Sequence, residues 1–445
     1  MEITSVPVST DPFLSQHPLA APQDRIAANR KAELLERYLS VRRFSEQLCQ
    51  TLEPEDYVIQ TMPEMSPTKW HLAHTSWFFE TFVAKPLLRD YRPLHPQYAF
   101  LFNSYYNAAG KMHARPQRGL ISRPTVKDTY TYRAHVDATM EQLLQNADDS
   151  QIEALAPVIV LGLNHEQQHQ ELMLTDIKHA FWMNPLRPVF RPERASAQNS
   201  AADPGWLQFD AGLYSIGFEG EDFCFDNERP RHQVFLTSFS LATQLVTNQE
   251  FLAFIEDGGY QRPELWLSLG WTAVNERAWH APLYWEQREG NWWMMTLAGM
   301  RPIRWDEPVC HLSYFEADAY SRWAGARLPT EAEWEVAATN TSIAGQFAES
   351  GRFHPSPADG LPGPLKQMFG DLWQWTQTSY APYPGYQPQP GALGEYNGKF
   401  MCNQYVLRGA SCATPRSHAR RTYRNFFPPD ARWQFMGLRL AKDIS

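Results

Sequence analysis

The spacing of apolar residues divides this chain into two parts with different secondary structure. Up to about residue 184, apolar residues recur with a helical period in four segments, at about 25–52, 66–85, 124–146 and 150–183. Beyond a Pro-, Ser- and Ala-rich stretch, short β-like runs at 212–217 and 232–237 alternate with Gly- and Pro-rich loops. The pattern predicts an α+β chain in which a four-helix bundle precedes a separate domain of short strands and helices.

The length of the chain supports the same division, because 445 residues are too many for one ordinary core. We expect a disordered tail at 1–22, a helical bundle at 23–184, a linker at 185–205 and a second domain at 206–445. Within the second domain we expect helices at about 248–256 and 313–324, and a third that starts at Thr330.

Composition excludes several functional classes. The formal net charge is −9, whereas a protein that binds nucleic acid needs a basic face. No run approaches the ~18 apolar residues of a membrane-spanning helix, and residues 1–24 lack the basic and apolar regions of a signal peptide. The five cysteines are irregularly spaced and odd in number, which fits reduced thiols better than a disulfide framework. We expect a cytoplasmic protein with neither nucleic acid nor membrane as a partner.

Two histidines lie four residues apart in the last helical segment. His165 and His169 therefore stack on one helix face, where two imidazoles can share one metal ion. The apolar residues of the same face are Val158, Leu161, Leu172 and Met173. The pair therefore points into the bundle, and a buried imidazole needs a partner, of which a metal ion is a common one. The alternative is a pair of polar surface residues.

A third ligand is needed to complete such a site. The best candidate is His74, which lies between Trp70 and Trp77 on the apolar stripe of the second helical segment. His71 competes with it but lies off the centre of that stripe. The alternative for His74 is a histidine packed under the tryptophans and bonded to a carbonyl group. Three neutral imidazoles with open positions suit Fe(II), and imidazole also suits Zn(II) or Cu(II).

Residues 165–169 also fit the His-Glu-x-x-His signature of zinc hydrolases, in which Glu166 is the general base. The extended form of that signature fails, because Leu172 follows at the third position after His169 and no Gly-x-x-His comes after it. A zinc metallohydrolase is therefore an alternative interpretation of the same residues.

Six segments of the second half resemble the formylglycine-generating-enzyme/sulfatase-modifying-factor fold, which is C-type-lectin-like. In chain order they are LVTNQEF at 245–251, PVCHLSY at 308–314, WAGARLPTEAEWE at 323–335, GDLWQWT at 370–376, LRGAS at 407–411 and GLRLA at 437–441. In the first half, WHLAH at 70–74 and HEQQH at 165–169 are similar to the marks of a DinB-like helical bundle. Together the two halves resemble the iron(II)-dependent sulfoxide synthases of ergothioneine biosynthesis.

The resemblance implies an enzyme that uses O₂ to join a cysteine sulfur to C2 of the hercynine imidazole and to oxidise that sulfur to a sulfoxide. It implies that His74, His165 and His169 are ligands of Fe(II). It also implies that Gln168 contacts the hercynine imidazole. The residues implied at the hercynine carboxylate and in the pocket wall are Asn425, Phe426 and Phe427.

The chain departs from one branch of this family at two places. Members that use γ-glutamylcysteine carry Asn-Trp-Asp where this chain has NFF at 425–427, and a catalytic tyrosine where this chain has GALG at 391–394. Instead, Tyr105 and Tyr106 in the first half resemble the branch that uses free cysteine. We therefore expect cysteine as the donor. γ-Glutamylcysteine as donor and histidine as acceptor, as in ovothiol biosynthesis, are the alternatives.

The chemistry of these residues agrees with the implied roles. A tyrosine has a pKa of about 10, so Tyr105 or Tyr106 is protonated near neutral pH and can donate a proton. The alternative is that the two rings fix a loop to the bundle. Substrate carboxylates need fork-like donors, which Arg115, Arg118 and Arg123 supply just after the tyrosines, although each of them also fits a solvated surface.

The second domain is not expected to generate formylglycine. That activity needs a pair of cysteines after the Arg-Gly-Gly-Ser motif, and this chain has Cys412 with no cysteine after it. We expect the domain to cover the metal site and to form a wall of the substrate pocket. A non-catalytic binding module is the alternative for the whole chain, because this fold also occurs in binding proteins.

Overall fold

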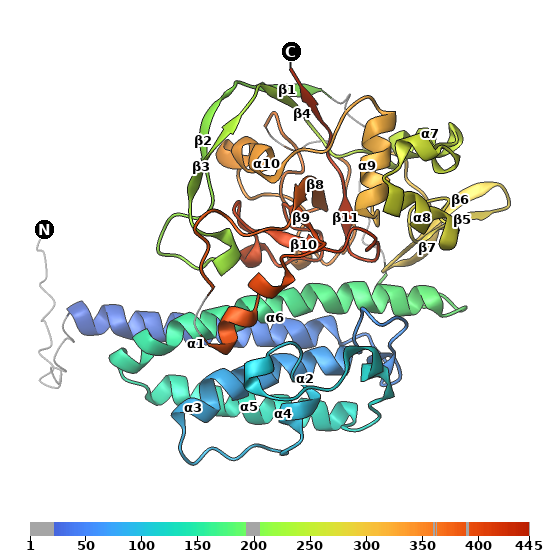
Figure 1. Cartoon of the computed structure of the whole chain (residues 1–445). Helices are drawn as coiled ribbons and strands as arrows, with labels where there is room; N and C mark the ends of the chain where they lie inside the picture. Colours follow the sequence, from blue (N-terminus) through green and yellow to red (C-terminus); the bar gives the residue numbers. More distant parts are fainter. Residues whose placement is uncertain (1–21, 193–204, 359–360, 362, 389–390, 445) are drawn as a thin grey trace, which may run out of the picture.

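The N-terminal helices and the C-terminal sheets form two layers in the computed structural model, with the helices below and the sheets above (Figure 1). The structure describes residues 22–192, 205–358, 361, 363–388 and 391–444. The tail expected up to residue 22 therefore lies outside the described residues except for Pro22, and so does most of the expected linker, residues 193–204. In the described part of the chain, no helix is both long and apolar enough to cross a membrane.

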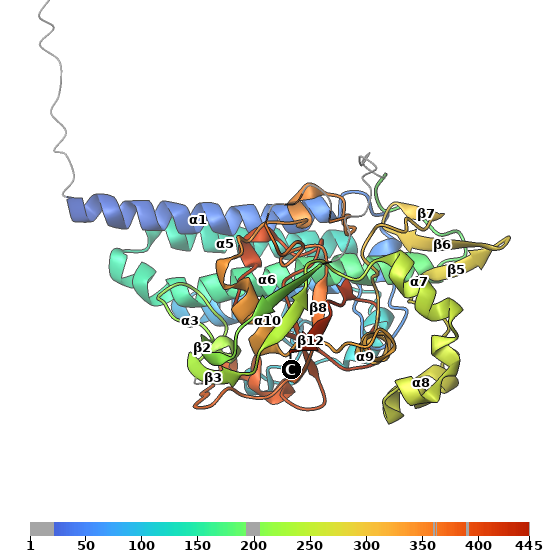
Figure 2. The same ribbon diagram turned by 90° about the horizontal axis from the view of Figure 1, so that it is seen from above.

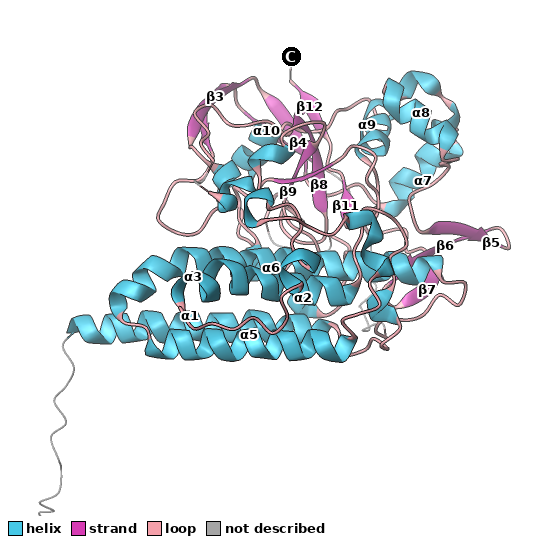
Figure 3. Cartoon of the chain, turned by 60° about the horizontal axis from the view of Figure 1, so that its bottom comes forward, coloured by secondary structure: helices cyan, strands magenta, loops and turns pink. Residues whose placement is uncertain are grey.

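Four long helices form the N-terminal domain: α1 (Pro22–Leu48), α2 (Thr68–Phe79), α5 (Val126–Asn146) and α6 (Asp149–Met183). α2 packs against both α5 and α6, and α1 packs along α6, as Figure 3 shows from below. Thr125 and Asp148 cap α5 and α6 through capping boxes, which satisfy backbone donors that a helix start leaves free. The expected four-helix bundle is confirmed.

The end of the second helix differs from the expected one. α2 ends at Phe79, continues as a π-helical turn at Glu80–Ala84 and joins the short helix α3 (Lys85–Leu87), which contains Pro86. The expectation that the helix stops before Pro86 is wrong, because proline lacks only a donor that is unpaired anyway at the start of α3. The connection from α3 to α5 contains the short helix α4 (Tyr98–Leu101).

The second domain combines short strands with four helices of the described chain. Its strands are β1 (Trp206–Phe209), β2 (Gly212–Ile216), β3 (His232–Leu236), β4 (Phe239–Ala242), β5 (Trp285–Arg288), β6 (Asn291–Thr296), β7 (Gly299–Pro302), β8 (Trp373–Ser379), β9 (Tyr405–Arg408), β10 (Asn425–Phe427), β11 (Met436–Gly437) and β12 (Ala441–Asp443). Its helices are α7 (Asn248–Glu256), α8 (Ser268–Glu276), α9 (Tyr314–Trp323) and α10 (Glu331–Ala337). The expected helices correspond to α7, α9 and α10, whereas α8 was not expected.

The strands pair in four small sheets. The largest has the order β10-β9-β8-β11, in which β8 pairs with β9 antiparallel and with β11 in parallel. The others have the orders β1-β4-β12, β5-β6-β7 and β2-β3. Figure 2 shows the β5-β6-β7 sheet at one end of the molecule, and α7 and α8 are also on that side. The α+β fold class is therefore as expected.

The upper face of α6 carries the contact between the two domains (Figure 1). Glu171 of α6 is buried, and it accepts hydrogen bonds from Trp373 Nε1 at 2.8 Å and from Thr414 Oγ1 at 2.7 Å. One turn earlier, Gln167 Nε2 donates to Ser417 Oγ at 2.6 Å. The helix that carries two candidate metal ligands is therefore also the surface on which the second domain packs.

α2 and α6 approach each other closely at Gly162. A Cβ atom on Gly162 would lie 2.7 Å from a ring carbon of Phe78 and 2.7 Å from a ring carbon of Phe79, closer than real Cβ contacts. Both rings are fully buried, so they have little room to move. The missing side chain of Gly162 therefore sets the distance between the two helices.

We expect Gly162→Ala to lower the free energy of unfolding by about 1–3 kcal/mol, the usual cost of overpacking a core. The measurement is chemical denaturation followed by circular dichroism. Glu153→Ala is the matched control, since Glu153 is an exposed residue of the same helix and its change should be within about 0.5 kcal/mol. Equal stability of the two variants would contradict the close-approach argument.

Candidate metal centre

Three imidazoles from two helices converge in the middle of the bundle. His74 of α2 and His165 and His169 of α6 bring one possible ligand atom each to within 4.8 Å of one another. The Nε2 atoms of His74 and His165 are 3.1 Å apart. Among the residues that the structure describes, this is the one group of three or more His, Cys, Asp or Glu side chains with such geometry. The structure therefore brings together the three residues selected from the sequence.

Local packing explains why His74 points inward. Every residue of α2 is buried, so the helix runs through the bundle core rather than along its surface. The His74 ring stacks between two indoles, with centroid distances of 4.5 Å to Trp70 and 5.5 Å to Trp77. The ring has one orientation because stacking holds both of its faces.

The second nitrogen of two imidazoles is fixed by a hydrogen bond. His74 Nδ1 donates to the carbonyl oxygen of Phe102 at 2.5 Å, which leaves Nε2 with a free lone pair. His169 Nδ1 lies 2.8 Å from His71 Nδ1, and His71 Nε2 lies 3.1 Å from an Asp176 carboxylate oxygen. Because Asp176 accepts a hydrogen bond from His71 Nε2–H, His71 Nδ1 can accept one from His169 Nδ1–H, and His169 Nε2 then has a free lone pair as well. His71, the competing candidate, is thus a partner of His169.

Burial keeps the three imidazoles neutral. It lowers the pKa of His165 to about 3, and it lowers the pKa of His74 and His169 well below the usual value. A neutral imidazole has the lone pair that a metal ion needs. The donor set therefore consists of three uncharged nitrogen ligands.

These residues fit a divalent metal ion of the first transition row. Two nitrogens that lie about 2.1 Å from one ion at a right angle are about 3 Å apart. The distance of 3.1 Å between the two Nε2 atoms agrees with that arrangement. His165 Nδ1 has no hydrogen-bond partner in the described chain, so either nitrogen of His165 can carry the proton, and the Nδ1–H tautomer offers an Nε2 lone pair beside that of His74.

Glu166 has a structural environment that differs from that of a metalloprotease base. Its two carboxylate oxygens accept hydrogen bonds from Arg42 Nη1 at 2.9 Å, Arg133 Nη2 at 2.6 Å and Ser45 Oγ at 2.6 Å. Burial raises the pKa of the carboxyl group, but the two guanidinium charges outweigh burial and lower the pKa to about 2. An ionised carboxylate with both oxygens occupied is poorly placed to take a proton from water.

Three tyrosines line one side of the triad. The Tyr105 and Tyr106 rings are 4.8 Å apart, and the hydroxyl of Tyr106 is buried without a hydrogen-bond partner among the described residues. Tyr396, from the second domain, lies 5.7 Å from the His165 ring, 6.0 Å from Tyr105 and 6.5 Å from Tyr106. Burial raises the pKa of all three phenols, so they are protonated at neutral pH.

Sequence reasoning missed Tyr396. Residues 391–394, which correspond to the tyrosine-bearing position of related enzymes, contain no tyrosine, and Tyr396 follows two positions later. The sequence signal for Tyr396 was its place in a long loop, close to the position where related enzymes carry a tyrosine. The two domains therefore both supply a tyrosine to the centre.

Gln168 joins the two domains beside the triad. Its amide nitrogen donates to the Tyr423 hydroxyl, and its amide oxygen accepts from the Tyr396 hydroxyl. His418 Nε2 contacts the same Tyr423 hydroxyl at 3.1 Å. The sequence prediction placed Gln168 at an imidazole substrate, and the structure places its amide next to the ligands, facing the second domain.

The three candidate arginines have different environments. Arg118 is buried, donates to Ser66 Oγ at 2.9 Å and Ser104 Oγ at 3.0 Å, and stacks 3.4 Å over the Trp70 ring. It makes no ion pair with a carboxylate of the described chain, and burial lowers its pKa to about 8. Arg115 is exposed and bonds to the Glu64 carbonyl oxygen. Arg123 is also exposed, and its Nη1 donates to the carbonyl oxygen of Ser122 at 3.2 Å, so the structure does not bring it to the others.

Asn425, Phe426 and Phe427 form the edge strand β10, and all three are half-buried. Phe426 stacks on Tyr380 at 4.1 Å and lies 5.9 Å from Phe400, whose ring is 5.4 Å from Tyr105. Phe427 points to the opposite face of the strand and lies 5.9 Å from Trp433. Phe426 is therefore connected to the tyrosine side of the centre, and Phe427 is not.

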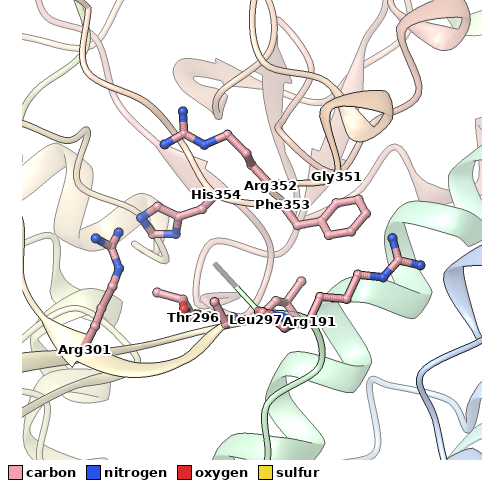
Figure 4. A pocket seen from close by; sticks show the side chains of 10 residues that line it. Arg191, Thr296, Leu297, Arg301, Gly351, Arg352, Phe353 and His354 are labelled. Carbon is pink, nitrogen blue, oxygen red and sulfur yellow. Dashed lines mark hydrogen bonds between the residues drawn. The ribbon is translucent and has the colours of Figure 1, made fainter. Parts of the chain in front are cut away.

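A separate cavity lies away from the triad (Figure 4). Its volume is about 20 Å³, which is room for about one water molecule, and Arg191, Arg301, Arg352 and His354 are among its lining residues. The three guanidinium groups point in different directions rather than toward one centre. The cavity is therefore not a second candidate for the substrate.

Comparison with known proteins assigns the same two halves. Residues 37–173 match the DinB superfamily, and residues 192–360 and 361–444 match the sulfatase-modifying factor enzyme 1-like domain. The chain is 32% identical to the hercynine oxygenase of Mycolicibacterium smegmatis over 86% of this chain and 93% of that protein. It is 32% identical to the hercynine oxygenase of Mycobacterium tuberculosis over 86% of this chain and 92% of that protein. It is 30% identical to that of Mycolicibacterium thermoresistibile over 94% of this chain and 96% of that protein. The chain therefore belongs to the hercynine oxygenase family of oxygen-using oxidoreductases.

Proposed function

We propose that this enzyme joins the sulfur of cysteine to C2 of the hercynine imidazole and oxidises that sulfur to a sulfoxide, in ergothioneine biosynthesis. One O₂ is consumed. The S–H bond of cysteine and the C2–H bond of hercynine are broken, and a C–S bond and an S–O bond are formed. The second oxygen atom leaves as water with the two hydrogens, so the atoms balance. The observation that carries the proposal is the buried group of three neutral imidazoles faced by tyrosines from both domains.

We propose Fe(II) as the metal ion, held by His74, His165 and His169. Three imidazoles with open positions suit this ion, and bound Fe(II) would supply the one-electron chemistry that O₂ requires. A zinc hydrolase is disfavoured because the carboxylate of Glu166 is bound to Arg42 and Arg133 and cannot serve as the base. The position of Asp176 and His71 behind His169 supports a metal site, since ligating histidines commonly carry such a partner.

Several residues are proposed to bind hercynine. The Gln168 amide can hydrogen-bond the imidazole once the Tyr396 hydroxyl gives up its place. Asn425 offers an amide to the hercynine carboxylate, and its oxygen already accepts from the Phe426 N–H at 2.9 Å. The aromatic face of Phe426, on the tyrosine side of β10, suits a quaternary ammonium group and excludes water, whereas Phe427 on the opposite face has no part in this contact.

Arg118 is the proposed site of the cysteine carboxylate. It is a buried cation without a carboxylate partner in the described chain, and such a charge is costly unless a ligand pairs with it. Its contact with Ser104 fixes it next to the tyrosine pair. Exposed Arg115 is close enough to contribute to the same positive field. The surface position of Arg123 gives that residue no part in the proposal.

Free cysteine is the preferred donor. The aromatic Phe427 stands where related enzymes that use γ-glutamylcysteine carry a carboxylate, and it packs near Trp433 instead of facing a charged backbone.

All five cysteines of the chain have free thiols, which supports the proposal of a reducing, cytoplasmic location.

The tyrosine pair is the proposed source of the proton that accompanies C–S bond formation. A phenol with a raised pKa keeps its proton until a more basic oxygen develops beside it. The Tyr106 hydroxyl is held by no carboxylate or carbonyl oxygen of the described chain, and it interacts with the Tyr105 hydroxyl. Tyr105 is its neighbour and can pass or position the proton.

Incubation of the Fe(II)-loaded protein with O₂, hercynine and cysteine should give a sulfoxide with mass equal to hercynine plus cysteine plus one oxygen, less two hydrogens. Parallel reactions use γ-glutamylcysteine as the donor or histidine as the acceptor. Anaerobic loading and mass spectrometry are the measurement. No sulfoxide from any pair of substrates would overturn the proposed function, and product from γ-glutamylcysteine alone would overturn the assignment of the donor.

Arg118→Met should raise the KM for cysteine at least 10-fold, because a charge-assisted carboxylate contact is worth about 1.5–3 kcal/mol. The KM for hercynine should change much less. Arg123→Met is the matched control, because it removes the same charge from an exposed position, and its kinetics should equal those of the wild type. Equal KM values for cysteine in the two variants would show that Arg118 does not hold this carboxylate.

Tyr105→Phe and Tyr106→Phe, made separately, should divert at least one variant from the sulfoxide to the sulfinic acid of the thiol. Without the proton donor, both oxygen atoms are expected to go to the sulfur, since a thiol plus O₂ balances a sulfinic acid. The ratio of the two products by mass spectrometry is the readout. Wild-type ratios in both variants would exclude the phenols as proton donors.

A further inference from the structure

A segment of the second domain holds the backbone on both sides of Tyr106. Glu395 accepts hydrogen bonds from the Asn107 N–H at 3.0 Å, the Asn107 side-chain amide at 3.1 Å and the Ala108 N–H at 2.8 Å. Lys399, one helical turn later, donates to the carbonyl oxygen of Tyr105 and to Glu395. Glu395 and Lys399 therefore hold the backbone on both sides of the tyrosine pair from outside the bundle, and the two residues together are called the bracket here.

The two side chains of the bracket are both charged and pair with each other. The Glu395 and Lys399 side chains form an ion pair of 2.9 Å. The partly desolvated position tends to raise the pKa of Glu395, but the backbone donors and the Lys399 ammonium lower it to about 2, so the group is ionised. Hydrogen bonds from N–H groups to an ionised carboxylate are stronger than neutral ones.

The same segment inserts Tyr396 between the bracket and the metal ligands. The Tyr396 ring stacks on Phe225 of its own domain at 5.3 Å and reaches the Tyr105, Tyr106 and His165 rings. Movement of residues 391–400 would therefore move the outer support of both tyrosines. Within the first domain, the Tyr106 ring packs on aromatic rings, and its carbonyl oxygen accepts a hydrogen bond from Asn103 Nδ2 at 3.0 Å. The Tyr105 carbonyl and the Asn107 and Ala108 N–H groups on either side are the ones that the second domain holds.

We propose that Glu395 and Lys399 are positioning residues that hold the Tyr105–Tyr106 backbone in register with the metal centre. The inference rests on the proposed function, because it assigns to the second domain control over the proposed proton donors. Neither residue contacts a metal ligand, so each acts through the tyrosines. The second domain thus sets how the reaction partitions between C–S bond formation and simple oxidation of the thiol.

The first test measures the bracket without any catalysis. In Glu395→Gln, the amide keeps one acceptor oxygen and turns the other terminal atom into a donor that faces a backbone N–H, so the hydrogen bonds from Asn107 and Ala108 cannot both form. Hydrogen–deuterium exchange of peptides that cover residues 105–109 should be at least 10-fold faster than in the wild type. Glu219→Gln is the matched control, because it removes an exposed ion pair to Arg231 in the same domain, and its exchange at 105–109 should equal that of the wild type.

The second test measures the products. Glu395→Gln and Lys399→Met should each lower the ratio of sulfoxide to sulfinic acid at least 5-fold, with little change in the KM for cysteine. The lower ratio should not fall further when Glu395→Gln is added to the tyrosine variant that shows diversion, because both changes act on one step. A residue needed only for folding would lower all activities together and leave the ratio unchanged.

The outcomes separate the two proposals. A wild-type protein that makes no sulfoxide removes the proposed function, and with it the reaction that the bracket would serve, whatever the exchange data show. A wild-type protein that makes sulfoxide while Glu395→Gln has wild-type exchange overturns the bracket. Faster exchange with an unchanged product ratio shows that the bracket exists but does not position the tyrosines for the reaction, which also overturns the inference.

Discussion

The close approach of α2 and α6 is the constraint on which the centre depends. At Gly162 the absence of a side chain lets the Phe78 and Phe79 rings rest directly on the α6 backbone. His74 lies one helical turn before Phe78, and His165 lies three residues after Gly162. The short distance between α2 and α6 that the missing side chain of Gly162 allows therefore also brings His74 Nε2 to 3.1 Å from His165 Nε2. A wider separation would leave a pair of ligands on one helix and an unrelated histidine on another.

Charge is arranged around this contact so that the ligands are neutral while their neighbours are ionised. Burial keeps the imidazoles uncharged, whereas the adjacent Glu166 is ionised between Arg42 and Arg133. A buried ion network is costly unless every charge is paired, and the two carboxylate oxygens here are fully occupied. Glu166 therefore anchors α6 to α1 and α5 through Arg42 and Arg133. Beside the tyrosine pair, the buried guanidinium of Arg118 has no carboxylate partner in the described chain, which leaves a place for an anionic ligand.

The sequence was sufficient to predict the two-domain α+β fold and the three histidines of the triad, but not all the residues that line the site. Helical periodicity identified the four long helices, and the i, i+4 spacing together with the Trp70–Trp77 stripe selected the three histidines. Arg118 and Arg123 could not be separated, since one-dimensional spacing does not show which guanidinium is covered by Trp70. Tyr396 was missed because its position depends on how a long loop of one domain lies on the other, which no local pattern encodes. The π-helical turn after Phe79 likewise follows from packing rather than from propensity.

The candidate site draws residues from two domains because both domains pack on α6. One face of α6 carries the candidate ligands into the bundle, and Gln167 and Gln168 between them point to the second domain, where Gln168 meets Tyr396 and Tyr423. Glu171, buried against Trp373 and Thr414, fixes the second domain at a defined position along the helix. A shift of the second domain along α6 would therefore displace Tyr396 relative to His165 while leaving the metal ligands in place. In this architecture the bundle positions the three candidate ligands, and the way the second domain packs on α6 determines which residues face them.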